Sequence, residues 1–218
     1  MLELNKIYNI DCYKELPKLK NNGIDILITD PPYGINIIKD NKLSSSIGGN
    51  NIGKANEYKP IVGDNIKIDM TELFRVSKNQ IIFGGNYFNL PISKGWIVWD
   101  KKKKDDWWDN FSDGELIWTS YNMPLRIKRH LFMGCMQEGK REKRVHPTQK
   151  PLALMEWIIQ HYTKENDLIL DPFAGTGTTL VACKKTGRNF IGFELSKEYY
   201  DIACDRLLKE KDNLREWM

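Results

Sequence analysis

Short β-rich runs alternate with helical patterns along most of this chain, and that alternation limits its fold more than any other feature. It is typical of parallel strands joined by crossover helices. Strands are expected at Lys6–Ile10, Ile24–Thr29, Gln80–Phe83, Trp96–Trp99, Leu116–Thr119, Leu168–Leu170 and Phe190–Phe193. Helices are expected at Tyr13–Leu19, Lys67–Ser77, Pro151–Tyr162, Thr178–Lys185 and Lys197–Leu208. The pattern therefore predicts an α/β fold with a seven-stranded, mostly parallel sheet and helices on both faces.

The length of 218 residues predicts a single domain over residues 1–218. Hydrophobic residues make up 41% and charged residues 28%, which excludes a wholly disordered chain or a collagen-like fibre. The net charge of +4 permits a polyanionic partner without establishing one. Because the chain shows no apolar run of membrane-span length, no signal-peptide order and no CxxC pair, we expect a cytoplasmic protein without a membrane or metal partner.

Two stretches interrupt the alternation. Residues 34–58 are rich in Asn, Ser, Gly and Ile, and they predict a mobile loop, either a lid over a site or a plain surface loop. Residues 121–145 are rich in Arg, Lys and Gly and do not resemble packed core.

The first candidate site is Asp30-Pro31-Pro32-Tyr33, directly after a predicted buried strand. The two prolines prevent the strand from continuing. The turn therefore presents a carboxylate, a backbone carbonyl and an aromatic ring at one edge of the sheet. Two acceptors beside a ring suit an amino group on a planar base, as a flipped nucleobase requires. The alternative is an ordinary proline turn.

The second candidate site is the run from Asp171 to Thr179, DPFAGTGTT, between a predicted strand and a predicted helix. Its two glycines let the backbone approach a ligand, and the helix start offers free amide groups. No Lys follows Gly177, so the run is not a phosphate-binding loop. Glu194 follows the next predicted strand, where an acid typically takes ribose hydroxyls. Together these features favour a nucleoside cofactor over a plain tight turn.

Both motifs follow predicted strands, and ligands of open α/β sheets bind beyond the carboxyl ends of strands. A nucleoside cofactor and a base-like acceptor would therefore meet at one edge of the sheet.

With these motifs the chain resembles the β-class of S-adenosylmethionine-dependent amino-group DNA methyltransferases, of the N6-adenine type. The DPPY of residues 30–33 resembles the catalytic motif of that family, the DPFAGTGTT of residues 171–179 its cofactor motif, and the HPTQKP of residues 146–151 the segment that leads into the cofactor half. FGGNYF at residues 83–88 resembles a strand and turn beside the target pocket. The resemblance covers nearly the whole chain, and its motif order is that of the β-class.

The resemblance implies a Rossmann-like sheet in circularly permuted methyltransferase order, in which the strand expected after Glu194 and its helix is the chain's own start. It implies S-adenosylmethionine as cofactor. The cofactor residues it implies are Asp11, Cys12, Lys150, Asp171, Phe173, Ala174, Gly175, Thr176, Gly177, Thr178 and Glu194. An Asp at position 11 that caps the following helix is an equally physical interpretation.

Double-stranded DNA is the partner that the resemblance implies, and a homodimer and a cognate restriction endonuclease are further partners to consider. The recognition insert of larger family members is reduced here to about residues 121–145, which leaves the target sequence open. Basic side chains expected to contact phosphates are Lys101, Arg126, Arg129, Arg141 and Arg144. The alternative is a solvated charged loop.

The motifs predict direct transfer to an adenine N6 amino group. Asp30 and the Pro31 carbonyl would accept the two amino hydrogens, and Tyr33 would stack on the flipped base, with Pro32 holding the turn rigid. N4-cytosine methylation remains an alternative, although that branch of the family more often has Ser at the position of Asp30. An RNA or protein amide acceptor, a catalytically silent nucleic-acid-binding module and a nucleotide hydrolase also remain open.

Overall fold

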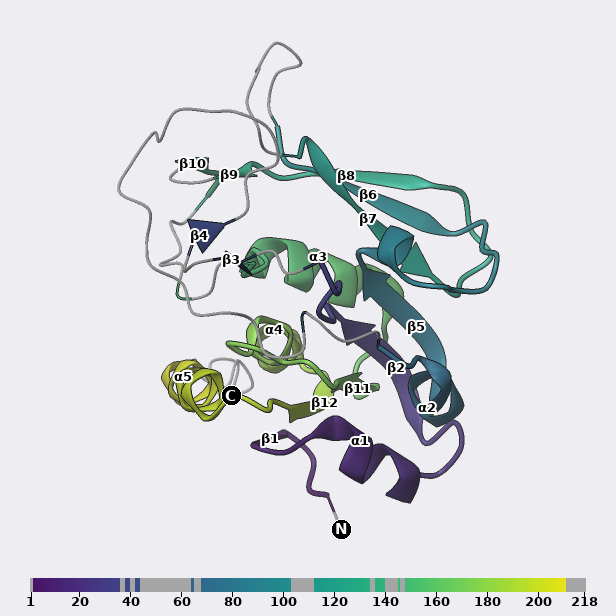
Figure 1. Ribbon diagram of the computed structural model, residues 1–218, viewed down its shortest axis with the longest axis vertical. Coiled ribbons are helices and arrows are strands. Elements are labelled where there is room, and N and C mark those ends of the chain that lie inside the picture. Colours follow the sequence, from purple (N-terminus) through teal and green to yellow (C-terminus); the bar gives the residue numbers. More distant parts are fainter. Residues whose placement is uncertain are drawn as a thin grey trace.

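The computed structural model describes residues 2–35, 38–39, 42–43, 64, 68–102, 112–133, 136–139, 145 and 148–210. These residues form an eight-stranded sheet in the order β1-β12-β11-β2-β5-β7-β6-β8 (Figure 1). The strands are β1 (Lys6–Tyr8), β2 (Ile24–Thr29), β5 (Ser77–Phe83), β6 (Trp96–Asp100), β7 (Gly114–Thr119), β8 (Arg126–Arg129), β11 (Leu168–Asp171) and β12 (Asn189–Phe193). Two small hairpins pair β3 (Ile38–Lys39) with β4 (Lys42–Leu43) and β9 (Phe132–Met133) with β10 (Met136–Gln137).

The large sheet is mostly parallel, as expected. Only β7 runs against its neighbours β5 and β6, while the other pairings in this sheet are parallel. The first strand of the chain, β1, pairs in parallel with β12, with Lys6 opposite Ile191 and Tyr8 opposite Phe193. The start of the chain therefore completes the sheet beside its last strand, which confirms the permuted order.

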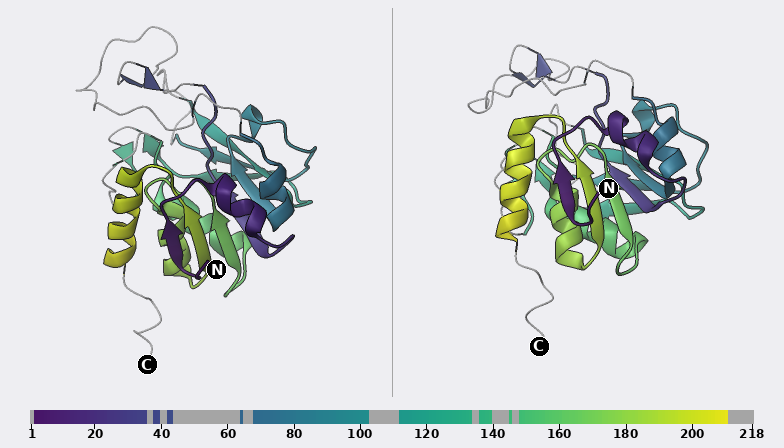
Figure 2. Two further views of the ribbon diagram at one scale, coloured as in Figure 1. Left: turned by 60° about the horizontal axis from the view of Figure 1, so that its bottom comes forward. Right: turned by 90° about the horizontal axis from the view of Figure 1, so that it is seen from below.

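Helices cover both faces of the sheet. One face carries α3 (Leu152–Tyr162), α4 (Thr178–Thr186) and α5 (Lys197–Lys209), and the other carries α1 (Cys12–Glu15) and α2 (Thr71–Val76) (Figures 1 and 2). The single turns η1 (Leu16–Lys18) and η2 (Gly85–Tyr87) follow α1 and β5. The side chain of Ser196 caps α5 by accepting from Tyr199 N–H, which fixes where that helix begins.

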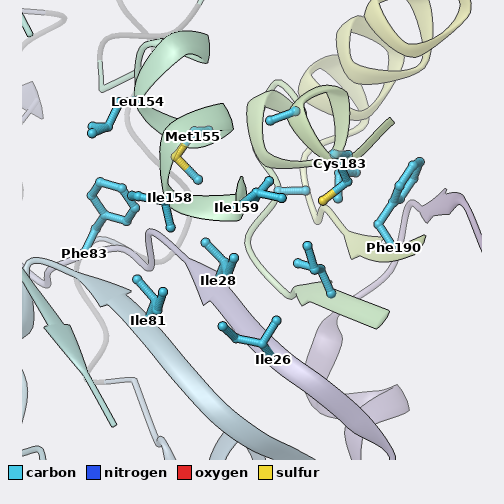
Figure 3. Packing of buried hydrophobic residues seen from close by; sticks show 14 of the residues in the cluster. Ile26, Ile28, Ile81, Phe83, Leu154, Met155, Ile158, Ile159, Cys183 and Phe190 are labelled. Atoms are coloured by element: carbon cyan, nitrogen blue, oxygen red, sulfur yellow. The ribbon is translucent and has the colours of Figure 1, made fainter. Parts of the chain in front are cut away.

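The core lies on both faces of the central strands, because side chains of a strand alternate between faces. Ile28 of β2 points toward Ile158 and Ile159 of α3, and Ile26 lies on the same face of the strand in the same core cluster (Figure 3). Leu27, between them in the chain, belongs to the core beneath α1 and α2. A strand buried on both faces reads as a continuous apolar run, which is why the sequence predicts β2 correctly.

The sheet has eight strands rather than the seven expected. The additional strand, β8, lies within the segment 121–145 and pairs with β6 at the edge of the sheet. Just beyond it, Leu131 and Phe132 are buried, so this part of the segment does contribute to the core. An edge strand with the sequence RIKR has exposed Ile127 and charged neighbours, and it lacks the apolar run that marks a buried strand.

Several sequence-based expectations lie outside the described residues. They include most of the predicted loop 34–58, the side chains of Arg141 and Arg144, and the first two residues of HPTQKP. Among the helices that the structure describes, none combines the length and the apolar character needed to cross a bilayer.

Candidate active site

The two predicted motifs lie on neighbouring strands at one edge of the sheet. β2 and β11 pair in parallel, so Asp30 and Asp171 both stand at carboxyl ends, at the point where the strand order reverses. Thr29 joins the two ends by donating its hydroxyl hydrogen to Asp171 Oδ1, at 2.9 Å. The proline turn and the glycine turn are thus fixed to each other through a buried contact.

Asp30 is held by two donors on different oxygens. The Tyr33 hydroxyl donates to Oδ1 at 2.7 Å, and the Lys150 ammonium donates to Oδ2 at 2.5 Å. Burial raises the pKa of Asp30 above its ordinary value, although the Lys150 charge and both hydrogen bonds oppose that shift. Burial also places the pKa of Tyr33 well above its usual range, so its phenol keeps the proton that it donates.

Tyr33 belongs to a small aromatic cluster. Its ring stacks on Tyr87 with centroids 4.6 Å apart and planes 13° apart, and Phe88 meets it edge-on at 6.0 Å. Gly84 makes this arrangement possible, because its φ of +62° is a left-handed conformation and a Cβ there would lie 2.4 Å from the Tyr33 ring. The FGGNYF segment therefore shapes the surroundings of the Tyr33 ring, while Tyr87 itself is half-exposed.

Lys150 and Lys101 take part in one charged network with Glu115 of β7. Lys150 Nζ lies 3.4 Å from Glu115 Oε2, and Lys101 Nζ lies 2.5 Å from Glu115 Oε1. Burial acts against each charge, but the carboxylates hold the pKa of Lys150 above its usual value and the ammonium groups hold that of Glu115 below. The structure thus places Lys150, expected at the cofactor, on Asp30. It places Lys101, expected on DNA phosphates, on Glu115.

The glycine turn is anchored to α5. Gly175 and Gly177 have φ values of +52° and +77°, and a Cβ on Gly177 would lie 2.9 Å from that of Ala203. Arg206 donates to the Thr176 carbonyl at 2.7 Å, and also to the hydroxyls of Thr176 and Thr178. The two threonine hydroxyls therefore face α5, and their predicted cofactor role stays a prediction.

Glu194 and Gly175 form the open side of the turn. Glu194 Oε2 accepts from Gly175 N–H at 2.7 Å, and Oε1 accepts from Ser196 N–H at 2.6 Å. Burial raises the pKa of Glu194, and it raises that of Asp171 to about 6. A Cβ on Gly175 would meet no atom of the described residues within 4 Å, so these residues leave the space beside this turn open. A carboxylate beside such a space suits a nucleoside with ribose hydroxyls.

The remaining predicted cofactor residues surround the same edge. Asp11 caps α1 by accepting from Tyr13 N–H at 3.0 Å, as the alternative interpretation held. Cys12 is buried, and burial raises the pKa of its thiol to about 12. Phe173 is half-buried, and Ala174 N–H donates to the Phe193 carbonyl at 2.9 Å. Their roles toward the cofactor stay predictions.

The two described arginines of β8 are not equivalent. The register places Arg129 opposite Asp100 and Arg126 opposite Ile97, so Arg129 stands nearer the carboxyl edge. Arg129 Nε donates to Asp100 Oδ2 at 3.0 Å, yet its side chain is 76% exposed. Arg129 is therefore the better placed of the two to meet a ligand that lies across this edge.

Two site residues were missed by the sequence reasoning. Glu115 lies in β7 just before the predicted strand Leu116–Thr119. Asp64 accepts from the N–H groups of Gly34 and Ile35 where the chain leaves the proline turn. Neither carries a local signal, since each gains its partner only through the fold. Within the described ranges, no three His, Cys, Asp or Glu side chains are grouped as metal ligands.

Comparison with protein families matches residues 24–205 to the family model N6_N4_Mtase, described as DNA methylase. Among curated proteins, the type II methyltransferase M1.MboII of Moraxella bovis is 28% identical over 93% of this chain and 96% of its own length. M2.LlaDCHI of Lactococcus lactis subsp. cremoris, also a type II methyltransferase, is 30% identical over 93% of this chain and 89% of its own.

Solved structures agree in fold. The complex of M1.HpyAVI with SAM is 28% identical and superposes with a TM-score of 0.57, covering 92% of this chain and 98% of its own. The cytosine-N4-specific PvuII DNA methyltransferase is 17% identical with a TM-score of 0.58, over 92% of this chain and 85% of its own. At that identity, the PvuII enzyme supports the fold alone.

Proposed function

The chain belongs to the N6/N4 family of DNA methylases, and from this premise we propose that it methylates the N6 amino group of adenine in double-stranded DNA. The observation that carries the proposal is the Asp30 carboxylate, fixed by Tyr33 and Lys150 at the strand end beside the glycine turn. Adenine N6 is a poor nucleophile, because its lone pair is conjugated with the ring. An enzyme for this reaction must therefore redirect that lone pair.

The proline turn supplies the acceptors for this task. Asp30 accepts one amino hydrogen and the carbonyl of the buried Pro31 accepts the other, which draws the nitrogen toward tetrahedral geometry. The same carboxylate is placed to take up the proton that leaves the nitrogen. Tyr33 offers its ring to the base, which then displaces Tyr87 from that ring.

The cofactor is S-adenosylmethionine, which a solved relative binds. The open space at Gly175 and the carboxylate of Glu194 fit its nucleoside part, with Glu194 in place for ribose hydroxyls. When bound, it supplies an electrophilic methyl group on a sulfonium sulfur. Asp171 keeps the glycine turn and the proline turn in register through Thr29, so that alignment rather than covalent chemistry lowers the barrier.

Asp at position 30 favours adenine over cytosine, because the N4-cytosine enzymes of the family more often carry Ser there. N4-cytosine methylation is the second candidate, since the matching family model covers both N6 and N4 methylases and a cytosine-N4-specific enzyme shares the fold. A homodimer and a cognate restriction endonuclease stay predictions.

Nucleoside mass spectrometry separates these candidates. Wild type and Asp30→Ala are expressed in a host whose DNA lacks both N6-methyladenine and N4-methylcytosine. We expect N6-methyladenine to rise with the wild type and to be absent with the variant. N4-methylcytosine in its place would transfer the assignment to cytosine. If folded protein that binds S-adenosylmethionine changes neither base, the proposal of DNA methylation is wrong.

A further inference from the structure

Lys150 lies between two carboxylates and hydrogen-bonds to only one of them. Its ammonium is 2.5 Å from Asp30 Oδ2 and 3.4 Å from Glu115 Oε2, and its side chain is 8% exposed. The Asp30 contact is a hydrogen bond, whereas the Glu115 contact is an ion pair without hydrogen-bond geometry. The ammonium also donates to the Thr148 carbonyl at 3.4 Å. It therefore has two occupied acceptors, with Glu115 Oε2 as a further acceptor nearby.

Glu115 is held so that this second acceptor stays in place. Its Oε1 accepts from Lys101 at 2.5 Å, which fixes the carboxylate on β7. Its Oε2 is buried, and none of the described residues donates a hydrogen bond to it. Buried polar atoms in folded proteins are nearly always hydrogen-bonded, so this oxygen, which has only the Lys150 ammonium at 3.4 Å, has room for a closer donor.

The proposed reaction adds a third donor to Asp30. Tyr33 occupies Oδ1 and Lys150 occupies Oδ2, so a target amino group meets a carboxylate whose oxygens are both engaged. Positive charge also develops on the target nitrogen during methyl transfer, and an ammonium on the same carboxylate opposes that charge.

We propose that Lys150 is a positioning residue that exchanges its ion-pair partner. It pairs with Asp30 in the free enzyme and moves to Glu115 Oε2 when the target amino group binds Asp30. The inference rests on the proposed function of Asp30. The move is short, and it exchanges one ion pair for another. Phe83 and Tyr33 face the ammonium with ring centroids 5.2 Å and 6.0 Å away, which favours a cation in this region.

The charged and titratable groups around Asp30 come from several elements. Two of them, Lys150 and Glu115, have opposite effects on the pKa of Asp30. Lys150 lies before α3, Glu115 on β7, Tyr33 in the turn itself, and Asp171 at the end of β11. The Lys150 charge lowers the pKa of Asp30 and the Glu115 charge raises it. Removing Glu115 therefore lowers the pKa of Asp30, and removing Lys150 raises it.

The test is the pH dependence of single-turnover methyl transfer, with saturating DNA and S-adenosylmethionine, for wild type, Glu115→Gln and Lys150→Met. Because Asp30 must be ionised, the rate falls on the acid side. We expect Glu115→Gln to shift that acid limb to lower pH and Lys150→Met to higher pH, each by roughly half a unit or more. We also expect Glu115→Gln to slow the reaction at neutral pH, because the ammonium loses its second ion-pair partner. The expected loss in rate is roughly tenfold, which corresponds in free energy to one pKa unit.

A matched control is Glu156→Gln. Glu156 of α3 pairs with Lys185 at 2.6 Å, and its side chain is 26% exposed, against 23% for Glu115. The same chemical change there is expected to leave the acid limb in place. Glu115→Asp keeps the charge and should keep the acid limb of the pH–rate profile near its wild-type position. This variant replaces Glu115→Gln if the latter does not fold.

Two results would overturn the proposal that Lys150 exchanges its ion-pair partner. One is an acid limb that shifts in the same direction in Glu115→Gln and Lys150→Met, and the other is a wild-type rate and limb in Glu115→Gln.

A readout that needs no turnover is the pKa of the Asp30 carboxyl, followed by ¹³C NMR in the protein without DNA. Opposite shifts in the two variants are expected there, and their absence contradicts the inference. A wild type that methylates no base refutes the proposed function instead.

Discussion

The position of the Tyr33 ring depends on the backbone of a single residue. Gly84 has a left-handed conformation directly after β5, and its missing side chain leaves room for the Tyr33 ring. Tyr33 in turn supplies the hydroxyl that holds Asp30. A side chain at position 84 would therefore act on the carboxylate through the tyrosine.

We predict that Gly84→Ala lowers methyl transfer by tenfold or more and destabilises the fold by roughly 1–3 kcal/mol, since it adds both backbone strain and a clash with the Tyr33 ring. Urea unfolding and single-turnover rates measure the two effects. Gly187→Ala is the matched control, because Gly187 has φ +72° but its Cβ would meet no atom within 4 Å in the part of the chain that the structure describes. It should lose stability without losing activity. Equal loss of activity in both variants would contradict this account of Tyr33.

Single residues also mark where the sequence is informative and where it is not. The turn at Asp30 and the glycine turn at Gly175 could be predicted because their chemistry is local to a few consecutive residues. The partners of Lys101 and Lys150 could not, since Glu115 reaches both only through the strand pairing of β6 with β7 and the return of the chain before α3. A lysine on DNA phosphates and a lysine on a buried carboxylate look alike in a sequence.

Among the elements, α5 has a function beyond covering the sheet. Its Arg206 reaches the glycine turn with hydrogen bonds of 2.7, 3.0 and 2.9 Å, and its Ala203 is in contact with Gly177. The helix thus holds the turn in the conformation that leaves the space at Gly175 open.

We predict that Arg206→Met raises the Kd for S-adenosylmethionine roughly tenfold, or ~1.4 kcal/mol, because three hydrogen bonds to the turn are lost while the helix stays packed. Isothermal titration calorimetry measures the affinity. Lys209→Met, on the same helix, removes only an exposed pair with Asp205 and should leave the affinity unchanged. An unchanged affinity in Arg206→Met would show that the turn does not need α5.

The elements also differ in how well the sequence announces them. β2, β11 and β12 are predicted correctly because helices cover both of their faces and their sequences are mostly apolar. β8 is missed because it lies at the sheet edge, where Ile127 is 57% exposed and the neighbouring residues are charged. The burial pattern that reveals a central strand is absent from an edge strand.

At the scale of the whole molecule, all of the proposed chemistry lies along one edge of the sheet. The permuted chain brings β1 beside β12 at one side of the sheet, and β8 forms the other side. On β8, Arg129 lies nearer than Arg126 to the edge formed by the carboxyl ends of the strands. DNA bound across this edge would meet Arg129 first.

We predict that Arg129→Gln weakens DNA binding and reduces the slope of log K against log salt by about 1, the loss of one phosphate contact. Arg126→Gln, on the same strand but further from the edge, should change the slope much less. Fluorescence anisotropy with a DNA duplex over a series of salt concentrations measures both. A larger effect from Arg126 would place the DNA on another face of the molecule.

The measurement that tests the central claim most directly uses purified protein, unmethylated double-stranded DNA and S-adenosylmethionine labelled in its methyl group. The DNA is hydrolysed and the label is located among the nucleosides, for wild type and for an Asp30→Ala variant whose cofactor affinity is intact. The predicted result is label in N6-methyladenine with the wild type and no labelled base with the variant. Label on cytosine carbon, or wild-type turnover by Asp30→Ala, would contradict transfer at the Asp30 turn.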